Sequence, residues 1–204
     1  MAPVAETEPR RRFEILPGFP PTGPLPLAVG NGESWGGHSE GFVIRFYPRS
    51  GAPWVGNFKP WASGVYLWHG VAEHPDGQHL IVVARGMAYL VDPENPESAK
   101  YVDANIQHVI SLPDLDAVLI SDGLSFTAIR KDGVWWESDR ISWDEFRNIR
   151  IENETLHGDA SSPDKTWWPF SLDLLTGRSE GGSFAGLPFR RVRKSARGDE
   201  GANS

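Results

Sequence analysis

The chain has 204 residues, of which 39% are hydrophobic, and its formal net charge is -7. It contains no cysteine, which excludes disulfides, thiolate catalysis and cysteine-ligated metal sites. No apolar run approaches the roughly 18 residues that span a bilayer, and the N-terminal residues MAPVAETEPRRR lack the apolar core of a signal peptide. We therefore predict a cytoplasmic protein with no membrane partner.

Charge is unevenly distributed along the chain. Residues 1–12 carry +1 and residues 188–204 carry +3, so that subtracting their combined +4 from -7 leaves -11 for the body. An acidic body repels phosphate backbones, and we expect no nucleic-acid partner for it. The composition predicts a disordered tail over residues 1–12, a single all-β domain over residues 13–187 and a basic disordered tail over residues 188–204.

The first half of the predicted domain begins with a proline-rich lead-in. The segment LPGFPPTGPLP, residues 16–26, holds five prolines, which exclude a helix and favour polyproline or edge-strand geometry. A hairpin is expected at Arg85-Gly86, and residues 91–98 are expected to form a loop. Short β-branched and aromatic runs between turn residues predict strands over residues 41–48, 54–58, 64–72, 79–84 and 87–91.

The second half repeats this pattern of short strands and turns. The only helix signal is Ser142 with Glu145, an S-x-x-E capping box that supports one or two helical turns at most. Strands are predicted over residues 106–111, 116–121, 125–130, 134–138, 146–152, 155–161 and 168–177.

Two segments share one plan of turn, strand, tight turn and strand. They are residues 74–94 and residues 111–138, and each begins with a Pro-Asp turn. Such a plan is typical of a β-propeller blade, but any antiparallel meander also produces it. We predict an all-β fold in which antiparallel meanders form a compact sandwich or a partly open barrel, with propeller-blade-like repeats as an alternative.

Tryptophan is abundant, with nine residues in the chain. Alternate residues of a strand share a face, so we expect the adjacent pairs Trp135-Trp136 and Trp167-Trp168 each to point to opposite faces, which leaves one of each pair outside the main core. The stretch DGVWWESDRISWDEF, residues 132–146, adds carboxylates and one arginine. The candidate binding residues are Trp135, Trp136, Glu137, Asp139, Arg140, Trp143, Asp144, Trp167 and Trp168.

Three interpretations of these residues stay open. They could be core and turn residues only, or a binding surface, or an acid–base pair of the glycosidase type. The favoured hypothesis is a non-catalytic protein that binds a protein partner through its tryptophan-rich surface, with a toxin-neutralising immunity protein as one analogy. The alternative is a carbohydrate-binding module or glycoside hydrolase that uses Trp135 or Trp136 with Glu137, Asp139 and Asp144.

No metal or cofactor is predicted. His74 and His79 flank Pro75-Asp76-Gly77, which is an ordinary turn, and their spacing matches no zinc signature. No catalytic residue is assigned.

Several phrases resemble a family of bacterial proteins without an assigned function. They include WVGNF at residues 54–58, RISWD at residues 140–144 and the pattern W-x-F-x-x-D-x-x-T-G that begins at Trp168. The family carries glycine after Ser-Trp-Asp, where this chain has Glu145. The resemblance implies a bacterial origin and one intact fold, and it implies no chemistry.

Overall fold

The fold consists almost entirely of β-strands. The computed structural model describes residues 11–30, 39–60 and 67–184, which contain sixteen strands and one 3-10 turn. The predicted all-β class is therefore confirmed. Of the predicted N-terminal tail only Arg11 and Arg12 are described, and the predicted C-terminal tail lies wholly outside the described residues. Within the described part of the chain, no helix is long and apolar enough to cross a membrane.

The strands form four sheets of four strands each. The first contains β1 (Phe13–Ile15), β3 (Phe42–Phe46), β4 (Trp54–Phe58) and β2 (Leu27–Val29), in that spatial order. The second contains β5 (Gly70–Glu73), β6 (Leu80–Ala84), β7 (Met87–Asp92) and β8 (Asn95–Asp103). The third contains β9 (His108–Leu112), β10 (Ala117–Ser121), β11 (Phe126–Arg130) and β12 (Gly133–Glu137). The fourth contains β13 (Phe146–Glu152), β14 (Thr155–Ser161), β15 (Trp167–Asp173) and β16 (Ser179–Gly181).

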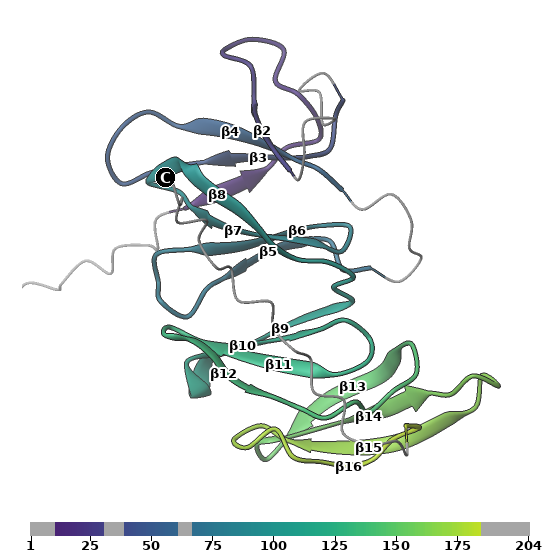
Figure 1. The fold of residues 1–204 in the computed structure, drawn as a ribbon. Coiled ribbons are helices and arrows are strands. Elements are labelled where there is room, and N and C mark those ends of the chain that lie inside the picture. The colour runs from purple at the N-terminus through teal and green to yellow at the C-terminus, as the bar shows by residue number, and fades with distance from the viewer. Residues whose placement is uncertain (1–10, 31–38, 61–66, 185–204) are drawn as a thin grey trace, which may run out of the picture.

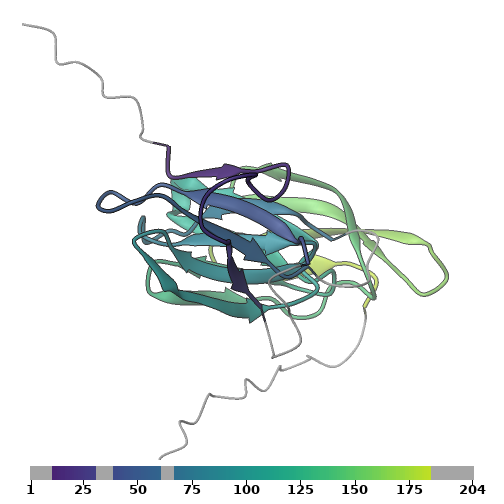
Figure 2. The same ribbon diagram turned by 90° about the horizontal axis from the view of Figure 1, so that it is seen from above.

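The four sheets lie one above another in chain order (Figure 1), and they overlap when the molecule is seen from above (Figure 2). None of them closes into a barrel. The last three sheets are antiparallel meanders of consecutive strands, which is the blade-like repeat that the sequence indicates. Equivalent hydrogen bonds join these sheets. The backbone N–H of Ile106 donates to the carbonyl of Gly86, in the middle turn of the second sheet, and the N–H of Ile141 donates to the carbonyl of Leu124, in the middle turn of the third.

Turn chemistry determines the predicted hairpin between β6 and β7. Arg85 and Gly86 both have positive φ, 46° and 84°, which is the left-handed pair that a two-residue hairpin turn requires. The five residues of β6 are all buried, as expected of a strand covered on both faces.

The first half also corrects two predictions. Residues 95–98 belong to the edge strand β8, although a loop was predicted there, because Pro96 costs no ladder hydrogen bond on an edge. Of the predicted strand over residues 64–72, residues 67–69 are not in a strand and β5 begins at Gly70, whereas residues 64–66 lie outside the described residues. Gly56 lies in the middle of β4 and leaves room for the ring of Phe58, which would lie 2.7 Å from an added Cβ.

Three hydrophobic clusters hold the stack together, one between each pair of neighbouring sheets. The first joins β3 and β4 to β6 and β7 through residues such as Phe46, Phe58 and Tyr89. The second joins the second and third sheets through smaller side chains such as Val83 and Val118. The third joins the third and fourth sheets and includes Phe126, Phe146 and Phe170, whose ring centroids lie 4.6 to 6.0 Å apart.

Candidate functional site

The structure separates the predicted site residues into two groups at opposite ends of β15. Trp136 donates its indole N–H to the carbonyl of Leu174, just beyond the C-terminal end of this strand, at 3.0 Å. Trp143 lies at the other end, where its backbone N–H donates to Ser161, the pairing partner of Trp167. A single site that combines both tryptophan pairs is therefore not formed.

A β-bulge overturns the expectation for Trp135 and Trp136. The pairing of β12 with β11 shifts so that Val134 faces Ile129 and Trp136 faces Ala128, which leaves Trp135 as the extra residue. Both rings pack against the third cluster and lie 6.2 Å apart. The prediction that these two rings point to opposite faces is wrong, because it assumed an unbroken strand.

Each of these two tryptophans has a local packing partner. The guanidinium of Arg130 lies 3.2 Å from the centroid of the Trp135 ring, which is a cation–π contact. The ring of Trp136 would come within 2.6 Å of a Cβ placed on Gly177. Packing therefore accounts for the burial of both side chains.

The candidate carboxylates Glu137, Asp139 and Asp144 do not converge on a large cavity. Glu137 and Arg140 line a hollow of about 70 Å³, together with Asp122 and Ser138. Asp139 and Asp144 are exposed and do not line it. Ligand pockets usually enclose some 300 to 1,000 Å³, so this hollow is too small for a sugar ring.

The second group gathers at one end of the fourth sheet, with side chains on both faces of β15. Arg140 lies over the rings of both Trp143 and Phe184, at 4.9 and 4.4 Å, and these two rings meet edge to face at 5.2 Å. Arg147 lies 4.1 Å over the ring of Trp167. We call this the tryptophan–arginine surface, and it comprises Arg140, Trp143, Arg147, Trp167, Trp168 and Phe184.

A buried pair of serines fixes the backbone beneath this surface. Ser142 and Ser161 are almost fully buried, and their hydroxyls lie 3.4 Å apart. The carbonyl of Ser161 accepts from the backbone N–H of Trp143 at 3.1 Å and from the hydroxyl of Ser183. The hydroxyl of Ser161 accepts from the N–H of Glu145 at 3.0 Å. The predicted capping box at Ser142 and Glu145 is thus a polar junction in a bend, and no helix forms there.

Trp167 and Trp168 occupy opposite faces of β15, as expected of an unbroken strand. All seven residues of β15 pair with β14 in continuous register. Trp167 lies on the face that carries Arg147, whose guanidinium also pairs with Asp159 at 3.4 Å. Trp168 shares the face of Phe170, but it lies near the start of the strand and is 51% exposed.

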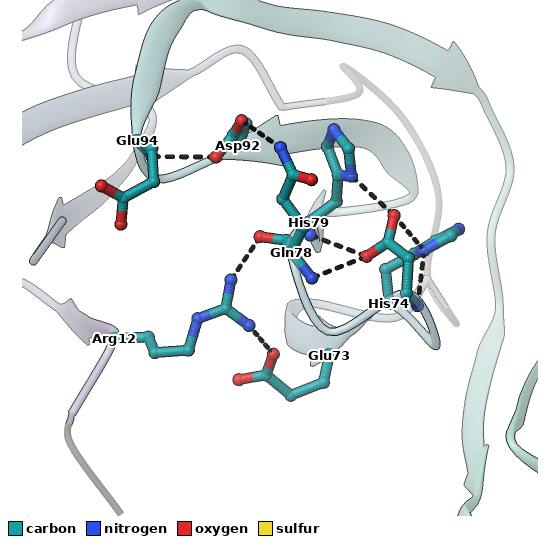
Figure 3. A network of polar contacts seen from close by, with 8 residues as sticks. Arg12, Glu73, His74, Gln78, His79, Asp92 and Glu94 are labelled. Atoms are coloured by element: carbon teal, nitrogen blue, oxygen red, sulfur yellow. Dashed lines mark hydrogen bonds and ion pairs between the residues drawn. The ribbon is translucent and has the colours of Figure 1, made fainter. Parts of the chain in front are cut away.

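A polar network between the first and second sheets is only partly predictable from the sequence. Figure 3 shows that Arg12, the last residue of the predicted N-terminal tail, reaches Glu73 and the carbonyl of Gln78. The Asp76 carboxylate lies 2.6 Å from His79 Nδ1 and 3.0 Å from His74 Nδ1. The Pro-Asp turn predicts the local part of this network, but no sequence pattern indicates its contact with Arg12.

The carboxylate of Asp76 is held in its charged form. Burial alone would raise its pKa, but hydrogen bonds from the backbone N–H groups of His79 and Gln78 and from the His79 ring lower the pKa to about 2. These contacts close the turn between β5 and β6. Among the described residues, no group of three or more histidines and carboxylates could hold a metal ion.

Comparisons with known proteins assign no family. No family model matches the chain, and no curated protein matches it. Among solved structures it is similar to the N-terminal domain of Nup159, with a TM-score of 0.36 and 13% identity. That similarity covers 87% of this chain and 51% of the other, so the chain spans about half the length of that structure.

Proposed function

We propose that this chain is a non-catalytic binding protein that recognises a protein partner through the tryptophan–arginine surface. The observation that carries the proposal is the exposure of two tryptophans at this end of the fourth sheet, Trp168 at 51% and Trp143 at 44%. Tryptophan and arginine are both enriched at binding hot spots, and tryptophan contributes a large contact area with little loss of side-chain entropy.

The backbone beneath the surface supports the same proposal. The buried serine pair and the continuous register of β15 fix the backbone at the tryptophan residues in the absence of a partner. A preformed site avoids the ordering cost that a flexible loop would meet on binding. The chain's net charge of -7 favours a basic partner through long-range attraction.

The carbohydrate alternative has weaker support from the same contacts. Arg130 covers one face of Trp135, and Gly177 lies against the ring of Trp136. Part of each ring is therefore covered and cannot stack on a sugar. The neighbouring hollow encloses about 70 Å³. A glycan-array signal abolished by Trp136→Ala, and retained by Trp168→Ala, would favour the carbohydrate alternative over a protein partner.

Site-specific photo-crosslinking tests the proposal directly. A photoreactive amino acid replaces Thr166, which is exposed and leaves Trp168 in place, in one sample and Leu175 in the other, since Leu175 is also exposed (42%) but lies at the other end of β15. We expect one protein to crosslink at position 166 and not at position 175. Its affinity for the unmodified chain should fall at least tenfold with Trp168→Ala, which is about 1.4 kcal/mol. An unchanged affinity would contradict the proposal.

A further inference from the structure

Five tryptophans lie in the third and fourth sheets or in the connection between them, and three of these already contact an arginine of the same chain. The guanidinium-to-ring distances are 3.2 Å for Trp135, 4.9 Å for Trp143 and 4.1 Å for Trp167. The ring of Trp136 instead packs over Gly177 and donates its N–H to a carbonyl. Trp168 is the fifth, and within the described ranges no cation and no aromatic ring packs on it.

We propose that Trp168 is the receptor for a cationic side chain, an arginine or lysine, presented by the protein partner. The inference rests on the proposed function and adds the chemistry of the partner's contact residue. An indole face is the aromatic surface that attracts a cation most strongly, and arginine is the cation most often found there.

The charge of the chain agrees with a cationic ligand, because the net charge is -7. The turn that precedes β15 contains Asp164 followed by Lys165, so this turn itself is neutral. Asp164 forms no ion pair in the described structure, and hydrogen bonds from Ser162 and Thr166 lower its pKa. On the opposite face of β15, Asp159 already pairs with Arg147, so that cation is locally compensated.

An NMR titration with a defined probe tests the inference. The indole N–H resonances of the full chain are assigned with single Trp→Phe variants, and the protein is titrated with acetyl-Gly-Arg-Gly-amide. The control peptide replaces arginine with citrulline, which has the same shape without the charge. We expect a saturable shift of the Trp168 resonance that is at least about threefold weaker with citrulline. The resonances of Trp143 and Trp167 should move less, because arginines already cover them.

Two outcomes would overturn the inference. Equal shifts with the two peptides would mean that the charge does not contribute. A Trp168 resonance that moves when Arg190, Arg191 and Arg193 are all replaced by Gln, with no peptide present, would mean that the chain's own C-terminal segment is the ligand. Neither outcome affects the crosslinking test of the proposed function, which asks only whether a protein binds at this end of β15.

Discussion

At the scale of single residues, the serine pair beneath the tryptophan–arginine surface combines burial with several hydrogen bonds. Ser161 is 1% exposed, and its hydroxyl accepts the N–H of Glu145 at 3.0 Å. A buried donor that loses its acceptor costs about 1–3 kcal/mol. We therefore expect Ser161→Ala to lower the free energy of unfolding by about 1–3 kcal/mol in urea denaturation.

The matched control is Ser171→Ala in β15, because the Ser171 side chain makes no hydrogen bond within the described residues and is only half-buried. It should change the unfolding free energy by less than about 0.5 kcal/mol. Equal effects of the two variants would contradict the role of the serine junction. Loss of partner binding with Ser161→Ala, at a temperature where the variant stays folded, would link the junction to the surface above it.

His108 makes the stability of the fold depend on pH. Burial lowers the pKa of this histidine, although a hydrogen bond with the Phe146 backbone opposes the shift. The folded protein therefore binds the proton more weakly than the unfolded chain. The resulting stability is fully present above the unfolded pKa, about 6.5, and is lost as the pH falls through that value toward the folded pKa.

We therefore expect the urea concentration at the midpoint of unfolding to decrease as the pH is lowered from 7.5 to 5. His108→Gln should reduce this difference, because glutamine does not titrate. Burial also lowers the pKa of His69, so some dependence should remain in the single variant. A pH dependence that is identical in the wild type and in His108→Gln would exclude His108 as its source.

At the scale of secondary-structure elements, local sequence patterns predict strands and tight turns more successfully than they predict strand partners. Period-two alternation and Arg85-Gly86 predict the β6–β7 hairpin, because both signals depend only on neighbouring residues. The parallel pairing of β2 with β4 could not be predicted, since it joins segments that are separated by β3. The bulge at Trp135 likewise depends on how β12 meets β11.

The same distinction applies to the candidate site. Tryptophan content and strand alternation indicated Trp143, Trp167 and Trp168 as candidates, and they lie at one end of the sheet because β15 and the Trp143 segment both contact Ser161. Composition could not exclude Trp135 and Trp136 from that group. Their placement at the other end of β15 is a consequence of sheet stacking, which single-sequence patterns do not encode.

The turn between β15 and β16 depends on Gly177. Its φ is 72°, in the left-handed region, and the Trp136 ring would lie 2.6 Å from an added Cβ. Gly177→Ala therefore combines backbone strain with a steric clash. Gly51→Ala is the matched control, because Gly51 has a φ of 94° and no atom lies within 4 Å of its Cβ position.

We expect Gly177→Ala to lower the unfolding free energy by about 1–3 kcal/mol more than Gly51→Ala does, since overpacking typically costs that much. The two variants are compared by thermal and urea denaturation under one set of conditions. Equal losses would mean that the backbone conformation alone accounts for the effect and that Trp136 moves aside without a measurable cost.

At the scale of the whole molecule, each sheet packs mainly on its sequence neighbours, so stability should be distributed along the stack. The first cluster contains only residues of the first two sheets, and the third contains only residues that belong to the last two sheets or connect them. Architectures of this kind gain stability from nearest-neighbour interfaces. A cavity in one cluster should therefore affect the adjacent sheets first.

Paired core variants test this expectation. Phe126, in the third cluster, and Phe58, in the first, are both fully buried. Phe126→Ala and Phe58→Ala should each cost about 3–5 kcal/mol through lost burial and a residual cavity. Hydrogen exchange measured by mass spectrometry should show faster exchange in β9–β16 for Phe126→Ala and in β3–β7 for Phe58→Ala. Uniform acceleration in both variants would mean that the four sheets unfold as one cooperative unit, with the weak second cluster still coupling the two halves.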